Sequence, residues 1–273
     1  MAGSLDSQQL GRFRREGILF PLRALPAGDA LARAARLDAF AHELGAPLTR
    51  LLRFKAHLRF RMLEEVARHP AILDAVEAII GPDILVFTST VWAKAPRDRH
   101  YVSWHQDSAY FGLEPHAEVT AWVALSDSRR DNGCLRVVPG SHLAADFAHE
   151  ETFHADNLLI RGQTIAGIPE ETALDVELEP GEFSLHHERM AHGSQVNASA
   201  RPRIGYAVFY IPPHVRSTLG RRTALLVRGR DAYGHWDPDP TPAGDNDPAI
   251  EAFMKRSFER YRDQEAAQAK PPV

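Results

Sequence analysis

Residues 84–94 read Ile-Leu-Val-Phe-Thr-Ser-Thr-Val-Trp-Ala-Lys, a run rich in β-branched and aromatic residues. Such residues favour the pleated, half-buried surface of a strand. The run therefore predicts a β-strand, and it lies where the pattern of the chain changes. The sequence before it has helical spacing, whereas short apolar runs separated by Gly, Pro, Asn and Asp follow it.

Helical spacing of apolar residues dominates the region before this strand. We expect helices over Ser7–Glu16, Asp29–Leu44 and Pro70–Ile80, each followed by a glycine that ends it. A further surface helix is expected near the end of the chain, over Pro248–Gln268.

Short extended runs follow residue 94, and no long helix separates them. They are Thr120–Leu125, Leu135–Val138, Ala173–Leu178, Phe183–His187 and Arg203–Ile211. This order predicts an antiparallel sandwich or barrel rather than alternating strands and helices. We expect a mainly β fold with flanking helices in a single domain over residues 1–273. The domain would comprise a helical region over residues 1–82, a β core over residues 83–212, and an irregular and helical region over residues 213–273.

The composition of the chain limits which kinds of binding partner are expected. The 273 residues carry a net charge of −4, so neither nucleic acid nor an anionic membrane is an expected partner. A single cysteine, Cys134, allows no internal disulfide and is expected to be a small buried residue. Neither a signal peptide nor a membrane-spanning run of roughly 18 apolar residues is recognised, which predicts a cytoplasmic protein.

The segment Trp104-His105-Gln106-Asp107 carries the chemistry. Residues i and i+2 of an extended segment point to the same face, so His105 and Asp107 can meet one metal ion. A second histidine, His192, lies in Met190-Ala191-His192-Gly193-Ser194. Two histidines and one carboxylate form the facial triad of non-haem Fe(II) oxygenases. Taken alone, His-x-Asp is a weak signal in a chain with 14 His and 36 acidic residues, and a polar strand end without ligands is the alternative.

Further sequence features accompany this segment in a defined order along the chain. They are Ala121–Leu125, Asp131–His142, Pro180–Glu182 leading to His192, and then Asn197, Ser199 and Arg203. The ordered pattern resembles the phytanoyl-CoA dioxygenase family of Fe(II)/2-oxoglutarate-dependent oxygenases, from about Leu51 to Val227. The resemblance implies a double-stranded β-helix, a cupin-like jelly-roll, for the core over residues 83–212.

The resemblance also implies roles for individual residues. His105, Asp107 and His192 would bind Fe(II), leaving positions for 2-oxoglutarate and O₂. Arg203 would bind the far carboxylate of 2-oxoglutarate, because a guanidinium matches a carboxylate with two hydrogen bonds. Arg201, two residues earlier, is the alternative.

Four further positions match co-substrate contacts of the family. Ser194 matches a hydroxyl contact, Trp122 a tryptophan beside the co-substrate, and Thr90 a lining position. Lys55 matches a lysine that pairs with 2-oxoglutarate if a small gap is allowed. An exposed surface lysine is the equal alternative for Lys55.

Asp107 also predicts the type of reaction. In related halogenases Ala or Gly replaces this carboxylate, so its presence favours hydroxylation, or a related oxidation, of an aliphatic C–H bond, with release of succinate and CO₂. The substrate is expected to be a small molecule. The arginine-rich segment 216–230 would suit an anionic substrate, and a solvated arginine surface is the alternative.

Two rival functions follow from the same residues. The first is a non-catalytic, cupin-like protein that binds a metal or ligand without turnover. The second is a zinc hydrolase that uses the same three ligands. The complete ligand set together with Arg203 favours the oxygenase. The sequence makes no prediction of the oligomeric state.

Overall fold

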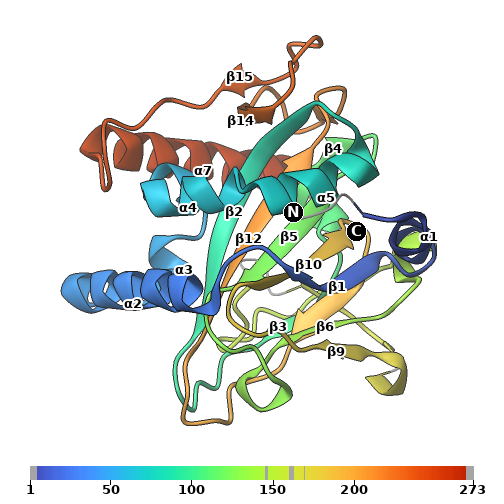
Figure 1. The fold of residues 1–273 in the computed structure, drawn as a ribbon, viewed down its shortest axis with the longest axis vertical. Helices are drawn as coiled ribbons and strands as arrows, with labels where there is room; N and C mark the ends of the chain where they lie inside the picture. Colours follow the sequence, from blue (N-terminus) through green and yellow to red (C-terminus); the bar gives the residue numbers. More distant parts are fainter. Residues whose placement is uncertain (1–4, 145–146, 160–162, 169, 269–273) are drawn as a thin grey trace.

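The computed structural model describes residues 5–144, 147–159, 163–168 and 170–268, and its centre is a large sheet (Figure 1). Neighbouring strands are antiparallel except at the edge pair β14 and β15. In sheet order the strands are β1 (Ile18–Arg23), β10 (Glu182–His187), β5 (Val119–Ala124), β12 (Arg203–Ile211), β2 (Ile84–Lys94), β14 (Thr223–Arg228) and β15 (Asp237–Pro238).

A smaller antiparallel sheet faces the large one. Its strands, in order, are β3 (Val102–His105), β11 (His192–Ser194), β6 (Leu135–Val137) and β9 (Leu174–Val176). Two short ladders complete the β structure. They pair β4 (Leu113–Glu114) with β13 (Arg216–Ser217), and β7 (His149–Glu151) with β8 (Gln163–Ile165).

Most of the helices lie on the other side of the large sheet (Figure 1). The α-helices are α1 (Ser7–Glu16), α2 (Ala27–Leu44), α3 (Leu48–Leu51), α4 (Arg61–Ala67), α5 (Pro70–Ile80), α6 (Ser108–Phe111) and α7 (Pro248–Gln268). Short 3₁₀ turns occur at η1 (Ala56–Leu58), η2 (Arg130–Asn132), η3 (Ser141–Leu143) and η4 (Glu170–Thr172). In the described residues, no helix is both long and apolar enough to cross a membrane.

The large sheet separates two hydrophobic cores, because side chains alternate between its faces. Strand β12 illustrates this, since all nine of its residues are buried. Tyr206 and Val208 pack into the core beneath the helices. Ala207 and Phe209 pack into the core that the small sheet covers. Arg203 has the same parity as Ala207 and Phe209, so its side chain enters the space between the two sheets.

The predicted elements are confirmed where local pattern is strong. The bounds of α1, α5, α7, β2 and β12 are those expected from the sequence. The helical region expected over residues 1–82 also contains a strand that was not predicted, because β1 forms an edge of the large sheet. Pro21 interrupts the strand signal there, and an edge strand tolerates proline because one side of it needs no ladder hydrogen bonds. The molecule is thus a mixed α/β fold with several antiparallel sheets.

Candidate metal centre and the two cavities beside it

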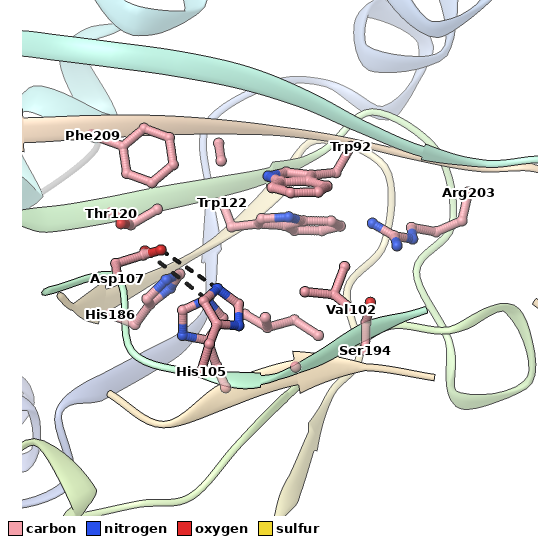
Figure 2. Close-up of a pocket in the computed structure, with 14 residues that line it drawn as sticks. Trp92, Val102, His105, Asp107, Thr120, Trp122, His186, Ser194, Arg203 and Phe209 are labelled. Atoms are coloured by element: carbon pink, nitrogen blue, oxygen red, sulfur yellow. Dashed lines mark ion pairs between the residues drawn. The ribbon is translucent and has the colours of Figure 1, made fainter. Parts of the chain in front are cut away.

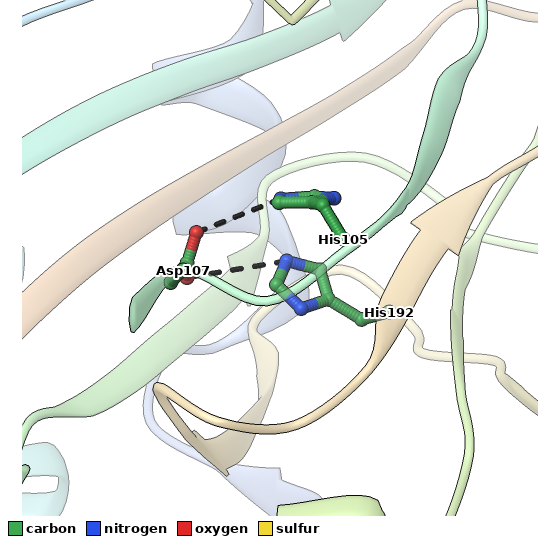
Figure 3. A group of neighbouring side chains, drawn as sticks. All are labelled: His105, Asp107 and His192. Carbon is green, nitrogen blue, oxygen red and sulfur yellow. Dashed lines mark ion pairs between the residues drawn. The ribbon is translucent and has the colours of Figure 1, made fainter. Parts of the chain in front are cut away.

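The three side chains predicted as metal ligands meet at the ends of two neighbouring strands (Figure 3). His105 ends β3 and lies opposite His192, which begins β11. Asp107 follows at the start of α6. One nitrogen of each histidine and one oxygen of Asp107 all lie within 4.8 Å of one another. The Nε2 atom of His105 is 3.5 Å from Oδ1 of Asp107, and Nε2 of His192 is 3.9 Å from Oδ2.

Backbone contacts orient both imidazoles. The Nδ1 atom of His105 lies 2.9 Å from the carbonyl oxygen of Ser103, and Nδ1 of His192 lies 2.9 Å from that of Met190. A carbonyl only accepts, so each Nδ1 carries the proton and each Nε2 presents a lone pair to the centre. Such contacts commonly fix metal-binding histidines.

Burial and charge hold His192 and Asp107 in the protonation states that bind a metal. Burial lowers the pKa of the His192 imidazole to about 3, which keeps that ring neutral. Burial opposes ionisation of Asp107, but the neighbouring histidines outweigh it and lower the pKa of this carboxyl. Two imidazoles and one carboxylate fit Fe(II), and they leave the opposite positions open for other ligands.

A first cavity of about 50 Å³ lies between the two sheets, and the three side chains line one end of it (Figure 2). Arg203 lies at the opposite end. The walls between them come from both sheets and are mainly apolar or aromatic. They include Trp92, Trp122 and Ala207 from the large sheet, and Val102, Leu135 and Ser194 from the small one.

Arg203 is a buried cation without a counter-ion in the described residues. Its residue is 3% exposed, its guanidinium lies 5.4 Å from the centre of the Trp122 ring, and its Nε has no hydrogen-bond partner among the described residues. Burial lowers its pKa to about 10, which still leaves it charged at neutral pH. A buried charge is costly unless it is paired, so this end of the cavity suits a ligand carboxylate.

The structure separates Arg203 from its alternative. Arg201 is exposed, and its guanidinium nitrogen donates to both oxygens of Asp131 at 3.0 Å. The arginine that reaches the cavity is therefore Arg203.

The other predicted co-substrate residues divide into two groups. Ser194 and Trp122 line the first cavity with Arg203. Thr90 lines a second cavity instead, and Lys55 lines neither. Lys55 is buried and pairs with Asp239 at 2.7 Å, so the surface-lysine alternative is wrong, and the structure does not bring Lys55 to Arg203.

Lys94 is a basic residue of this site that the sequence analysis missed. It is buried, and its Nζ donates to Oγ of Ser194 at 2.7 Å and to the carbonyl of Gln195. Burial, with a smaller effect of Arg203, lowers its pKa to about 6. Strand alternation offered a signal, because Lys94 is two residues after Trp92, which lines the cavity.

A second cavity, of about 110 Å³, meets the first at the metal centre. Trp92, His105, Asp107 and Phe209 line both cavities. The rest of the second cavity is mostly aromatic and includes Phe54, Phe87, Phe111, Phe258 and Tyr261. A molecule in the second cavity would therefore contact the metal centre from a different side than one in the first.

The arginine-rich segment 216–230, which the sequence suggested for an anionic substrate, contributes no residue to either cavity lining. Several of its arginines have counter-ions. Arg216 pairs with Glu114, Arg221 with Asp237, and Arg228 with Asp74 and Glu77. Cys134 is buried as expected, and burial raises the pKa of its thiol to about 12.

Comparisons with known proteins agree on one family. A family model described as "Phytanoyl-CoA dioxygenase (PhyH)" matches residues 26–205. Over 194 residues the chain is 29% identical to a "Probable alpha-ketoglutarate-dependent hypophosphite dioxygenase" of Stutzerimonas stutzeri, covering 67% of this chain and 66% of the relative. Over 159 residues it is 30% identical to the 1-deoxypentalenic acid 11-beta-hydroxylase of Streptomyces arenae, covering 54% and 53%. The chain thus matches about half to two thirds of the length of these curated relatives.

Solved structures extend the likeness to nearly the whole chain. The apo form of ThoJ, a non-haem monooxygenase, has a TM-score of 0.83 and 34% identity, covering 95% of this chain and 98% of the other. CytC3 with Fe(II) and alpha-ketoglutarate has a TM-score of 0.66 at 21% identity, covering 89% and 97%. The second likeness bears on the fold alone.

Proposed function

The chain belongs to the phytanoyl-CoA dioxygenase family, and we propose that it is an Fe(II)- and 2-oxoglutarate-dependent oxygenase that hydroxylates, or otherwise oxidises, an aliphatic C–H bond of a small molecule. Fe(II) and 2-oxoglutarate are the metal and co-substrate in this proposal, as in homologues. One observation carries it. Two histidines and a carboxylate meet at one end of a cavity, and the other end holds a buried arginine that has no counter-ion among the described residues.

We further infer that the two sheets form a double-stranded β-helix. Two antiparallel sheets that face each other across a ligand cavity support this arrangement. The positions of His105 and His192 at the ends of paired strands also support this inference.

Each group of residues has its own role in the proposed reaction. His105, Asp107 and His192 hold the metal, which with O₂ and 2-oxoglutarate supplies the oxidising chemistry. Arg203 binds the far carboxylate of 2-oxoglutarate and neutralises it in a buried place. Lys94 holds the hydroxyl of Ser194 beside the same end of the cavity. The indole rings of Trp92 and Trp122 exclude water from the space between.

The expected reaction is hydroxylation, with Asp107 as the reason. Its carboxylate would hold the metal where the related halogenases have Ala or Gly and bind a halide. One oxygen atom of O₂ would enter the C–H bond of the substrate, and the other would enter succinate as 2-oxoglutarate loses CO₂. Reduction of O₂ takes four electrons, of which 2-oxoglutarate would supply two and the C–H bond of the substrate the other two.

An anaerobic titration of the purified protein with Fe(II) and 2-oxoglutarate tests the assignment. When the keto acid chelates iron, a weak charge-transfer band appears in the visible spectrum. We expect the band in the unmodified protein and in the exposed-histidine control His235→Ala, but not in His192→Ala. Bound iron without the band would favour the non-catalytic binder or the hydrolase.

A further inference from the structure

We propose that the second cavity is the substrate site, that it takes a small apolar organic acid, and that Arg53 binds the carboxylate of this acid. The inference rests on the proposed function for one point only, namely that the molecule in this cavity is the one oxidised. The binding of an acid at Arg53 stands on the geometry of the cavity itself.

The walls of the second cavity define the body of the ligand. Phe87, Phe111, Phe209 and Tyr261 are among its aromatic residues, and Leu158 and Leu159 add aliphatic surface. A pocket with such a lining favours a hydrophobic ligand that a few polar groups orient. Its volume of about 110 Å³ is of the same order as the ~150 Å³ apolar cavity that admits benzene, so a ring or a short branched chain fits it.

Arg53 is the arginine in this otherwise mainly aromatic and apolar lining. Its residue is half-buried and lies just after α3. The hydroxyl of Thr90 donates to its backbone carbonyl at 2.8 Å, which ties Arg53 to strand β2. Thr90 and Arg53 line the cavity together.

The guanidinium of Arg53 has no ion-pair partner in the residues that the structure describes. Burial lowers its pKa, and the like charge of Arg50 lowers it further. In lacking a partner it resembles Arg203 and differs from Arg216, Arg221 and Arg228, which have counter-ions. In the part of the chain that the structure describes, each of the two cavities that meet at the metal centre therefore has one arginine without a counter-ion in its lining.

This arrangement gives the co-substrate and the substrate acid separate binding sites. Arg203 would bind the dicarboxylate co-substrate in the first cavity, and Arg53 would bind the substrate acid in the second. His105 and Asp107 line both cavities, so the body of the acid would extend from Arg53 towards the metal ligands and present a C–H bond to them. A half-buried guanidinium discriminates against a neutral analogue, because the analogue would leave the charge unpaired.

Calorimetric titration of the full chain tests the proposal, with Fe(II) and 2-oxoglutarate present under anaerobic conditions. The probes are benzoate, cyclohexanecarboxylate and 4-phenylbutyrate, each with its neutral amide. We expect at least one acid to bind tenfold or more tightly than its amide. In Arg53→Gln we expect the acid to bind no more tightly than the amide, whereas affinity for the amide stays within twofold.

Arg50→Gln is the matched control, because Arg50 is an exposed arginine three residues earlier. It should keep the preference for the acid. Equal binding of every acid and its amide, or no saturable binding of any acid at millimolar concentration, would overturn the proposal. So would an Arg53→Gln variant that loses 2-oxoglutarate affinity instead, since Arg53 would then serve the co-substrate.

The calorimetric titration and the charge-transfer band together separate this inference from the proposed function. An acid preference that depends on Arg53, in a protein that shows no charge-transfer band with Fe(II) and 2-oxoglutarate, would support the acid site and refute the oxygenase. A band without any acid preference would support the oxygenase and refute the acid site.

Discussion

At the scale of single residues, burial and pairing distinguish side chains that look equivalent in the sequence. Arg201 and Arg203 are two residues apart, yet one lies in the exposed segment before β12 and the other is the first residue of that strand. Asp131 already neutralises Arg201. Arg203 is buried opposite Lys94 in the ladder between β12 and β2, and no carboxylate of the described chain pairs with it. Of the two, Arg203 is therefore placed to bind a ligand.

We predict that Arg203→Gln weakens 2-oxoglutarate binding by about 10- to 100-fold, because a hydrogen-bonded charge contributes roughly 1.5–3 kcal/mol. Arg201→Gln should stay within about twofold of the unmodified protein, since it loses only an exposed ion pair. The charge-transfer band, followed as 2-oxoglutarate is added anaerobically, measures both affinities. A larger effect from Arg201→Gln would reverse the assignment.

At the scale of elements, close packing between β12 and β5 shapes the first cavity. Gly205 and the cavity-lining Ala207 are two residues apart and lie on the same face of β12. Ala207 pairs with Trp122 of β5. A Cβ atom at residue 205 would clash with the ring atoms of Trp122. Glycine is thus required there so that the indole can lie between Arg203 and the rest of the cavity.

We predict that Gly205→Ala displaces the Trp122 ring and destabilises the protein by about 1–3 kcal/mol, the usual cost of overpacking a core. The affinity for 2-oxoglutarate should fall with it, because the ring covers Arg203. Urea unfolding and the anaerobic titration measure the two effects. Gly244→Ala is the control, since nothing lies within 4 Å of a Cβ atom built there. Unchanged stability in Gly205→Ala would contradict this account.

At the scale of the whole molecule, a buried polar cluster links distant regions of the chain. Asp239, after β15, pairs with Lys55 at 2.7 Å, and Nε2 of His57 lies 3.2 Å from the same carboxylate. Nδ1 of His57 lies 2.8 Å from the hydroxyl of Ser89 on β2. Burial opposes ionisation of Asp239, but Lys55 and His57 outweigh it and lower the pKa of this carboxyl to about 2. The cluster joins the segment after α3, the large sheet and the C-terminal region.

We predict that Asp239→Asn lowers the free energy of unfolding by about 3–5 kcal/mol, because it leaves the buried Lys55 charge without its partner. Asp237→Asn is the matched control, two residues away. Its ion pair with Arg221 is exposed, so its loss should change stability little. Urea unfolding monitored by tryptophan fluorescence measures both variants. Equal effects of the two substitutions would show that the buried cluster does not stabilise the fold.

Buried neutral histidines should also make the metal-free protein sensitive to acid. Burial lowers the pKa of His187 to about 4, and it lowers the pKa of His57 as well. An unfolded histidine takes up a proton near pH 6.5, which the native state resists. The free energy of unfolding should therefore fall as the pH decreases from about 6.5 to 4, by up to about 1.4 kcal/mol per pH unit for each such histidine.

His187→Gln tests this origin, because it removes one of the histidines concerned. Urea unfolding at several pH values, with a chelator present, should give a shallower decrease for the variant than for the unmodified protein. A stability that is independent of pH over this range, or that rises towards acid, would be inconsistent with buried neutral histidines.

Local pattern was sufficient for much of the fold and for the identity of the chemical groups. Helix-forming polar residues before a glycine predict α1, and an apolar face with helical spacing predicts α5. Short extended runs, rich in β-branched and aromatic residues in β2, predict β2 and β12. These signals depend only on near neighbours. The order His105, Asp107 and His192 likewise identified the group that could bind a metal. Edge strand β1 escaped prediction, since its position depends on pairing with the distant β10.

The sequence by itself determined which residues could bind a metal and a dicarboxylate, because donor chemistry belongs to residue type. Only the tertiary structure decided where each basic residue lies and whether it has a partner. It pairs Lys55 with Asp239, brings Lys94 to Ser194, and leaves Arg53 and Arg203 without counter-ions among the described residues, in two cavities that meet at one centre. The physical reason is that burial and charge pairing are long-range properties. They depend on which surfaces the sheets bring together, and spacing along the chain does not encode them.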